Sequence, residues 1–208
     1  MTTTLAIECT TEACSVALFA AGGLVAGDWR MLGRGHAEAL VPMIAALPGR
    51  GRADAILVGL GPGSFTGVRI GLAAARALAL AWHVPVNGYP TLALVAAMAQ
   101  AVAGSQPVLV AMTGGHGEWF VQRFGGDGSA FGGLASLVPP EAAQLPQQLV
   151  AGSQAEARVE RRGTGEALSL WPDARQIGRL PSRAITSDLT PLYGRAPDAR
   201  LPGGIVLV

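Results

Sequence analysis

The segment AILVGLGPGSFTGVRIGLAAARALALAW, residues 55–82, decides the fold expected for this chain. Its first four residues are apolar and predict a short buried strand. Three glycines alternate over residues 59–63 and allow a sharp turn with close backbone approach, because glycine has no Cβ. Ser64 or Thr66 is the expected N-cap of the helix that follows. The segment therefore predicts a strand, a glycine-rich turn and a long helix in succession.

The helix expected over residues 65–82 is apolar almost all round and is interrupted only by Arg69 and Arg76. Such a helix has to be covered on every side, so its own sheet covers one face and another element covers the other. A small-residue strip at i, i+4 spacing gives it one thin edge: Gly67, Gly71, Ala75 and Ala79. A helix of the same chain or a helix of another chain could pack against that strip.

The glycine turn itself has a plain alternative, a tight strand-to-helix connection without a ligand. It lacks the lysine of a phosphate-binding GxxxxGK[ST] loop. It also lacks the GxGxxG spacing that is typical of dinucleotide binding.

A second apolar helix is expected just before this segment, over residues 35–47, with Pro42 predicting a kink or a start near Val41. Its apolar stripe and the long helix would together expose a patch larger than a lone monomer normally shows. We expect the patch to close a four-helix contact between two chains, the small residues allowing close approach. The alternative is that the second half of the chain, either a second lobe or the C-terminal segment, folds over this patch. The expected interface residues are Leu40, Met43, Ile44, Leu47, Gly67, Arg69, Gly71, Leu72, Ala75, Arg76 and Ala79.

Composition limits the class of protein. The chain has 208 residues, half of them hydrophobic and 14% charged, with a net charge of +1. A strong electrostatic footprint for nucleic acid is therefore missing. No run of 18 apolar residues is free of charge, proline or loop signals, so a membrane span is not expected. The opening MTTTLAIE does not read as a signal peptide, and Cys9 and Cys14 are expected to be free thiols in a reducing cytoplasm.

The order of elements predicts two α/β units, residues 1–104 and 105–208, the second smaller and ending in an irregular tail. Thr91 is the expected N-cap of a third helix, and residues 125–133 are expected to form a glycine-rich hairpin loop. Strands are expected over 4–8, 15–19, 24–29, 55–58, 84–86, 108–112, 119–124 and 148–151, and helices over 35–47, 65–82, 91–102, 139–145 and, weakly, 154–162.

The turn and helix, LGPGSFTGVRIGLAAARALA, resemble the signature of the TsaB (YeaZ) family, bacterial subunits of the machinery that puts threonylcarbamoyl on adenosine 37 of tRNA. LAIECTTEACSVALF, RGHAEALVPMI, GYPTLALVAAMA and PLYGRAPDARLP are similar to other segments of that family. The resemblance implies an actin/Hsp70/sugar-kinase-like fold, with two lobes that each have a mixed sheet and flanking helices. The signature loop on this chain is Gly61, Pro62, Gly63, Ser64, Phe65, Thr66 and Gly67.

The resemblance also implies a role: a non-catalytic subunit that dimerises with and supports a TsaD-type transferase, alongside a TsaE-type ATPase. It implies a homodimer when the chain is alone, contact with tRNA only through the complex, and no cofactor of its own. The TsaD family carries His-x-x-x-His as metal ligands, and the matching positions here are Thr91 and Val95. Neither side chain ligates a divalent metal as imidazole does, so no metal is expected.

A nucleotide contact is a further expectation, because the first hairpin turn of actin-type folds touches phosphate or its metal. Glu8, Thr10 and Thr11 stand there, although turn capping explains them equally well. Residues Thr113, Gly114, Gly115 and His116 replace the Asp-Ala-Arg that the family typically has, which removes an acid and an arginine. The alternative function is an ATP-dependent phosphotransferase of the sugar-kinase type, which would need two acids for Mg²⁺ and a base.

Overall fold

The computed structural model describes residues 2–194 and contains two five-stranded mixed sheets. The first sheet has the order β3-β2-β1-β4-β5 and the second has β10-β9-β6-β7-β8. The strands of the first sheet are β1 (Thr3–Glu8), β2 (Ala13–Ala20), β3 (Gly23–Met31), β4 (Ala55–Gly59) and β5 (Val86–Tyr89). Those of the second are β6 (Val108–Thr113), β7 (Trp119–Phe124), β8 (Ala130–Leu137), β9 (Leu149–Ala151) and β10 (Glu166–Leu168).

The two sheets repeat one topology. In each, an antiparallel meander of three strands is extended by two strands that run parallel to the first. The helices are α1 (His36–Ala46), α2 (Phe65–Trp82), α3 (Thr91–Ala103), α4 (Pro139–Ala143) and α5 (Ala155–Arg162). Short 3₁₀ turns add η1 (Pro48–Gly51), η2 (Ala174–Arg179) and η3 (Ser182–Ala184). The predicted α/β class with two mixed sheets is confirmed.

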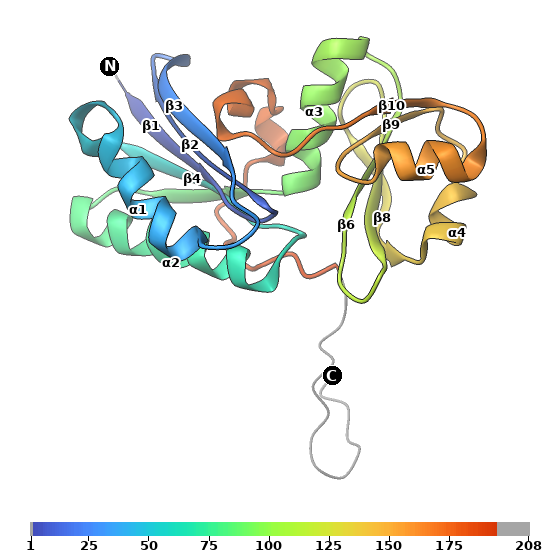
Figure 1. The fold of residues 1–208 in the computed structure, drawn as a ribbon. Helices are drawn as coiled ribbons and strands as arrows, with labels where there is room; N and C mark the ends of the chain where they lie inside the picture. The colour runs from blue at the N-terminus through green and yellow to red at the C-terminus, as the bar shows by residue number, and fades with distance from the viewer. Residues whose placement is uncertain (1, 195–208) are drawn as a thin grey trace.

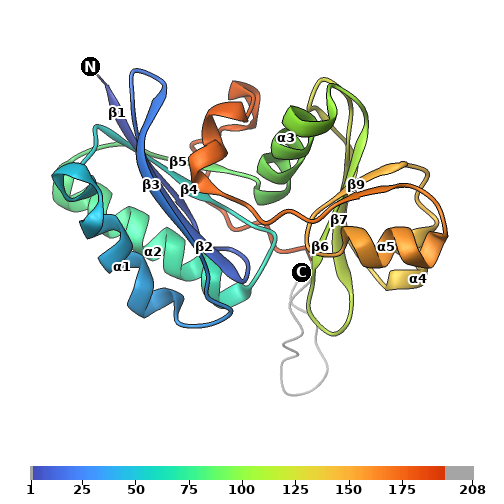
Figure 2. The ribbon, with the colours of Figure 1, turned by 45° about the horizontal axis from the view of Figure 1, so that its top comes forward.

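Helices cover the sheets in three layers (Figure 1). α1 and α2 lie side by side on the outer face of the first sheet, and α4 and α5 cover the outer face of the second. α3 and η2 fill the space between the two sheets, as the turned view shows (Figure 2). One apolar cluster therefore joins strand residues of both sheets through α3 and η2, which fixes the sheets against each other.

The chain after β10 returns to the first sheet. The backbone N–H of Ala174 donates to the buried Ser15 hydroxyl at 2.9 Å. Thr186 and Gly88 exchange two backbone hydrogen bonds at the edge of β5, and the N–H of Leu192 donates to the carbonyl of Leu60. Part of the region after residue 105 thus packs on the first sheet, and the domain division at residue 104 stays a prediction.

Several local expectations were wrong. The helix expected over residues 35–47 is present as α1, but it does not start late near Val41: it begins at His36 and carries Pro42 at an exposed position inside it. The strand expected over residues 84–86 shares only Val86 with β5, which continues to Tyr89. Thr91 is the first helical residue and Pro90 occupies the N-cap position of α3. β8 begins at Ala130, inside the segment expected to be loop, because pairing with β7 keeps this exposed edge extended.

Candidate functional site

The signature loop lies directly against the turn between β1 and β2. The Ser64 side chain accepts from the N–H of Gly67 at 3.3 Å, which confirms it as the N-cap of α2, and its own N–H donates to the carbonyl of Thr10 at 2.6 Å. A Cβ on Gly63 would lie 2.0 Å from that carbonyl oxygen. A Cβ on Gly67 would lie 2.2 Å from the carbonyl oxygen of Cys9. Both glycines are therefore required by backbone-to-backbone contact within the chain.

A buried polar network holds the loop from below. Glu8 is fully buried and accepts from the Thr10 N–H at 2.9 Å and from the Thr91 hydroxyl at 3.2 Å. Thr91 in turn accepts from the N–H of Gly61 at 3.2 Å, and its Oγ1 lies 3.0 Å from that of Thr10. Burial raises the pKa of Glu8 above its ordinary value, although these hydrogen bonds oppose the shift. The network ties three segments together: the end of β1, the glycine loop and the start of α3.

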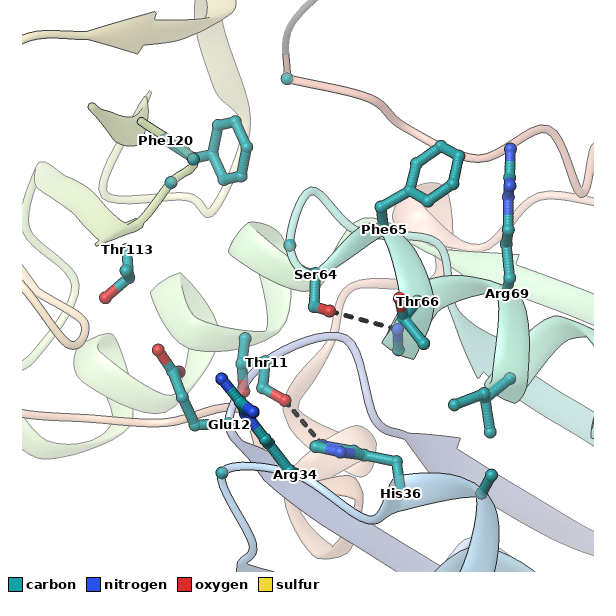
Figure 3. A pocket seen from close by; sticks show the side chains of 18 of the residues that line it. Thr11, Glu12, Arg34, His36, Ser64, Phe65, Thr66, Arg69, Thr113 and Phe120 are labelled. Carbon is teal, nitrogen blue, oxygen red and sulfur yellow. Dashed lines mark hydrogen bonds between the residues drawn. The ribbon is translucent and has the colours of Figure 1, made fainter. Parts of the chain in front are cut away.

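A cleft of about 1050 Å³ opens above the loop, between the two sheets (Figure 3). The β1–β2 turn, the N-termini of α1 and α2, and the residues after β6 form its walls. Its polar side chains include hydroxyls of Thr11, Ser64, Thr66 and Thr113, two arginines, Arg34 and Arg69, and two carboxylates, Glu12 and Glu38. Arrangements of this kind accommodate a small polar molecule or the edge of a partner protein.

His36 braces the cleft wall. The residue is 8% exposed, and its Nε2 lies 2.8 Å from the carbonyl oxygen of Thr11 (Figure 3). A carbonyl only accepts, so Nε2 must carry the proton in this contact. The ring therefore fixes the start of α1 to the β1–β2 turn.

The predicted nucleotide contacts are only partly placed at the cleft. Thr11 lines it, whereas Glu8 and Thr10 lie beneath the loop, 0% and 1% exposed, and are saturated by the network described above. Glu8 and Thr10 therefore do not line this cleft, and the nucleotide contact expected for them stays a prediction. The departure segment, Thr113, Gly114, Gly115 and His116, forms the wall of the cleft on the side of the second sheet.

The predicted interface residues divide into two groups. Only Arg69 and Arg76 are exposed, and Ala79 is half-buried. The rest pack in the chain's own core against the first sheet: Leu40, Met43, Ile44, Leu47, Gly67, Gly71, Leu72 and Ala75. The small-residue strip therefore faces the chain's own strands, and its expected role as a thin edge between two chains is wrong. Glycine permits close approach within one chain as well as between two chains. The spacing of the small residues in the sequence does not distinguish these two cases.

The outward face of α1 and α2 is made of other residues. Val41 is 60% exposed and Leu80 is 77% exposed. Exposed alanines extend this surface, which we call the helix face: Ala45, Ala46, Ala73, Ala77 and Ala81, together with Val41 and Leu80. The apolar composition of α1 and α2 did indicate an exposed apolar surface. The prediction, however, did not name the residues that form the helix face.

The positions that match metal-binding histidines are occupied by core residues. Val95 is fully buried in the cluster between the sheets, and the Thr91 hydroxyl is engaged with Glu8 and Gly61. Within residues 2–194, no group of three or more His, Cys, Asp or Glu side chains is arranged to hold a metal ion.

Both cysteines are free and buried in the cluster under α1 and α2. The thiol of Cys9 donates to the carbonyl of Gly67 at 3.2 Å. Burial raises the pKa of Cys14 to about 11 and that of Cys9 well above its ordinary value. α2, the one helix in the described part of the chain that is long and apolar enough to cross a membrane, lies over these thiols. Only 28% of this helix is buried, so its hydropathy comes from the exposed residues described above as well as from its inner side.

Comparison with known proteins identifies the family. A family model described as "TsaD: tRNA N6-adenosine threonylcarbamoyltransferase" matches residues 30–171. The tRNA threonylcarbamoyladenosine biosynthesis protein TsaB of Escherichia coli is 34% identical over 174 residues, covering 81% of this chain and 73% of that protein. YeaZ from Pseudomonas aeruginosa has a similar structure, with a TM-score of 0.76 and 31% identity over 93% of this chain and 100% of that one.

A more distant likeness concerns the fold alone. The ethanolamine utilization protein EutJ of Carboxydothermus hydrogenoformans has a TM-score of 0.51 at 12% identity, covering 86% of this chain and 90% of that one. The two-sheet topology and these likenesses confirm the predicted actin-like fold. The signature loop, the fold and the identity over most of its length together show that this chain belongs to the TsaB (YeaZ) family.

Proposed function

We propose that this chain takes part in the biosynthesis of threonylcarbamoyladenosine in tRNA, as a non-catalytic subunit that pairs with a TsaD-type transferase. Its family relatives carry that biosynthetic name. The match to a family model described as a tRNA threonylcarbamoyltransferase suggests a partner of related fold. A contact with tRNA would then be made through the complex rather than by this chain alone, in keeping with its net charge of +1.

The observation that carries this proposal is the exposed helix face. Leu80 and Val41 are large apolar side chains that are 77% and 60% exposed, and five exposed alanines join them on α1 and α2. Single apolar residues on a surface are ordinary, whereas exposed apolar residues gathered on two adjacent helices are typical of a protein-binding surface. Two such helices can pack against a helix pair of a partner by ridges-into-grooves contact.

The same surface accounts for the other expected partners. A second copy of the chain could occupy the helix face when the transferase is absent, and homodimer and heterodimer would then exclude each other. A TsaE-type ATPase would join the assembled pair. We place the assembly in the cytoplasm, where Cys9 and Cys14 would stay reduced.

The non-catalytic role rests on what occupies the catalytic positions. Thr91 and Val95 stand where the transferase family has its metal-binding histidines, and both are committed to packing in the core. Glu8, the acid that the alternative phosphotransferase function would need at the first hairpin, does not line the cleft. The cleft keeps Glu12 and Glu38, so the alternative is addressed by experiment below.

The first experiment places a charge on the helix face. Val41→Glu should raise the Kd for the purified TsaD-type subunit at least about 100-fold. Burying an unpaired carboxylate costs more than about 2.8 kcal/mol, and each 1.4 kcal/mol of binding free energy changes the Kd tenfold. Val25→Glu is the matched control, because Val25 is 52% exposed on the edge strand β3. The thermal midpoints of both variants should match that of the wild type. Equal affinities for the two variants would contradict the proposed pairing.

A second measurement separates the two functions. The isolated chain should show no ATP turnover approaching 1 s⁻¹, the lower end of ordinary enzymatic rates. Turnover at about that rate, abolished by Glu12→Gln or Glu38→Gln, would favour the phosphotransferase instead.

A further inference from the structure

Three side chains at the cleft end of α2 form a stacked group that is partly exposed. The guanidinium carbon of Arg69 lies 3.4 Å from the centroid of the Phe65 ring, and the rings of Phe65 and Tyr193 are 5.5 Å apart and tilted by 31°. The Nε–H of Arg69 also donates to the Tyr193 hydroxyl at 3.3 Å. We call Phe65, Arg69 and Tyr193 the aromatic cluster. Phe65 is 53% exposed and Tyr193 is 43% exposed, so both rings keep uncovered faces.

Hydrogen bonds along residues 186–194 hold Tyr193 beside Phe65 and Arg69. The strap, residues 186–194, starts at the edge of β5 through the paired backbone bonds between Thr186 and Gly88. Its Leu189 carbonyl accepts from Arg76 at 3.3 Å, and its Leu192 N–H donates to Leu60 at 2.8 Å, one residue before the tyrosine. These contacts set the main-chain position of Tyr193. Its ring is held by the hydrogen bond from Arg69 and the contact with Phe65, so little side-chain freedom remains to be lost on binding.

The aromatic cluster continues the helix face. Five residues of α2 are exposed, and each lies three or four residues from another of the set: Arg69, Ala73, Arg76, Ala77 and Leu80. Residues at that spacing share one side of a helix. Phe65 begins the same row, so the cluster and the helix face form one surface that runs from the cleft to the far end of α2.

We propose that the aromatic cluster is an anchor for the TsaD-type subunit, at the cleft end of the surface that the proposed function assigns to pairing. This inference rests on that proposed function. Phenylalanine, tyrosine and arginine held in a preformed stack match the chemistry of interface hot spots, where rigid aromatic side chains and arginine dominate the binding energy. Half-exposed rings leave area that a partner can bury.

An unpaired RNA base is the other ligand that stacks on aromatic rings. Charge argues against it here. Affinity for RNA comes largely from contacts with phosphate. The arginines that line the adjoining cleft, Arg34 and Arg69, are matched by the carboxylates Glu12 and Glu38. A protein partner with an apolar pocket and acceptors for Arg69 fits this balance better.

The experiment titrates variants of the full chain against the purified TsaD-type subunit from the same genome. Phe65→Ala and Tyr193→Ala should each raise the Kd at least about tenfold, as expected for hot-spot residues. Tyr193→Phe keeps the ring and loses only the hydroxyl's bond to Arg69 of the same chain, so the Kd should change less than about threefold, the lower end of the effect of one hydrogen bond. Phe131→Ala is the matched control, because Phe131 is 39% exposed and stacks with Arg123 at 5.0 Å on the second sheet. Its Kd should equal that of the wild type.

Each outcome decides one point. Normal affinity of Phe65→Ala and Tyr193→Ala, with binding abolished by Val41→Glu, would overturn the anchor and leave the proposed pairing intact. Normal affinity of all three would overturn both. If the two aromatic variants pair normally but the assembled complex loses tRNA affinity, the cluster contacts RNA and the anchor is wrong. Where Phe65→Ala lowers the thermal midpoint, Phe65→Leu replaces it, with the same loss of affinity expected because the stack with Arg69 is gone.

Discussion

The two sheets share one topology but hold their outer helices in different ways. α2 approaches the first sheet through glycine, so close that a Cβ on Gly67 would lie 2.2 Å from the Cys9 carbonyl oxygen. α5 packs on the second sheet through side chains, among them Ala155 and Val159. Backbone contact tolerates no added atom, whereas side-chain contact can be rebuilt with other residues of similar volume.

The outward surfaces of the two helix layers differ as well. α1 and α2 expose valine, leucine and alanines, whereas α5 exposes Glu156, Glu160 and Arg161. The duplicated architecture thus has one layer suited to a partner and one suited to water. The close backbone packing is therefore found in the same lobe as the candidate binding surface.

The largest expected effect tests the backbone contact of α2. Gly67→Val should lower the free energy of unfolding by at least about 3 kcal/mol, because the side chain has no space against the Cys9 carbonyl. Ala77→Val, on the exposed side of the same helix, should cost under about 1 kcal/mol, the difference in helix propensity. Urea unfolding measures both. Similar losses for the two variants would contradict the assignment of inner and outer sides.

The second prediction compares a buried and an exposed threonine network. Thr91→Val should cost about 1–3 kcal/mol, because the Gly61 N–H and a Glu8 oxygen lose a buried partner. Thr113 makes the corresponding contacts at the end of β6, with Ser153 and Gln154, but in exposed positions. Thr113→Val should therefore stay within about 0.5 kcal/mol of the wild type. Thr91→Ser should recover most of the loss, and failure to do so would mean that packing alone matters at Thr91.

The third prediction concerns pH and again singles out the first sheet. Burial raises the folded-state pKa of Glu8 above 4.5, so the native state binds more protons than the unfolded state between pH 4.5 and that raised pKa. Stability should fall as pH rises through this window, by at most about 1.4 kcal/mol per pH unit for one group. Glu8→Gln should remove this component of the slope. Parallel pH profiles for wild type and variant, measured by thermal unfolding, would refute it.

The smallest expected effect lies in the second helix layer. Arg158 is buried, its Nε and Nη1 lack hydrogen-bond partners in the described structure, and burial lowers its pKa. The Leu145 carbonyl that it contacts is also bonded by Arg162. Arg158→Met should therefore leave stability unchanged or raise it by about 1 kcal/mol, since replacing a buried charge by an apolar chain of similar length is often stabilising.

Arg158→Ala is the companion variant for that last comparison. It removes the same charge but leaves a cavity, and it should cost about 2 kcal/mol or more. A loss for Arg158→Met as large as that for Arg158→Ala would show that the guanidinium itself stabilises the second lobe. The proposed tolerance of side-chain contact would then be wrong.

Sequence reasoning predicted the elements best where the signals were local. Ser64 next to a glycine turn and an apolar run predicted the start of α2, and short apolar runs predicted the first meander and the first two strands of the second, whereas β8 was missed. It failed where the deciding partner is remote. Thr91 resembled an N-cap, but its hydroxyl bonds Glu8, 83 residues away. Arg69 meets Tyr193 across 124 residues, so the aromatic cluster had no local signature.

The side of α2 that meets the sheet was also beyond a one-dimensional pattern. Gly67 and Gly71 indicated close approach correctly, but spacing does not say which backbone approaches. The carbonyl of Cys9 and the Sγ of the same residue, 2.9 Å from a Cβ built on Gly71, occupy that space in the folded chain. Only the register of β1 under α2 shows it.

The strap is synthesised after both sheets, and this order affects when the protein can assemble with others. While the ribosome is still making the second sheet, the Leu60 carbonyl and the edge of β5 at Gly88 lack the partners that Leu192 and Thr186 later supply. Domains generally fold from the N-terminus during translation. In this protein, the first lobe cannot complete its hydrogen bonds until the strap has emerged from the ribosome. Phe65 and Arg69 gain Tyr193 at the same moment, so a nascent or truncated chain does not yet display the complete surface to other proteins.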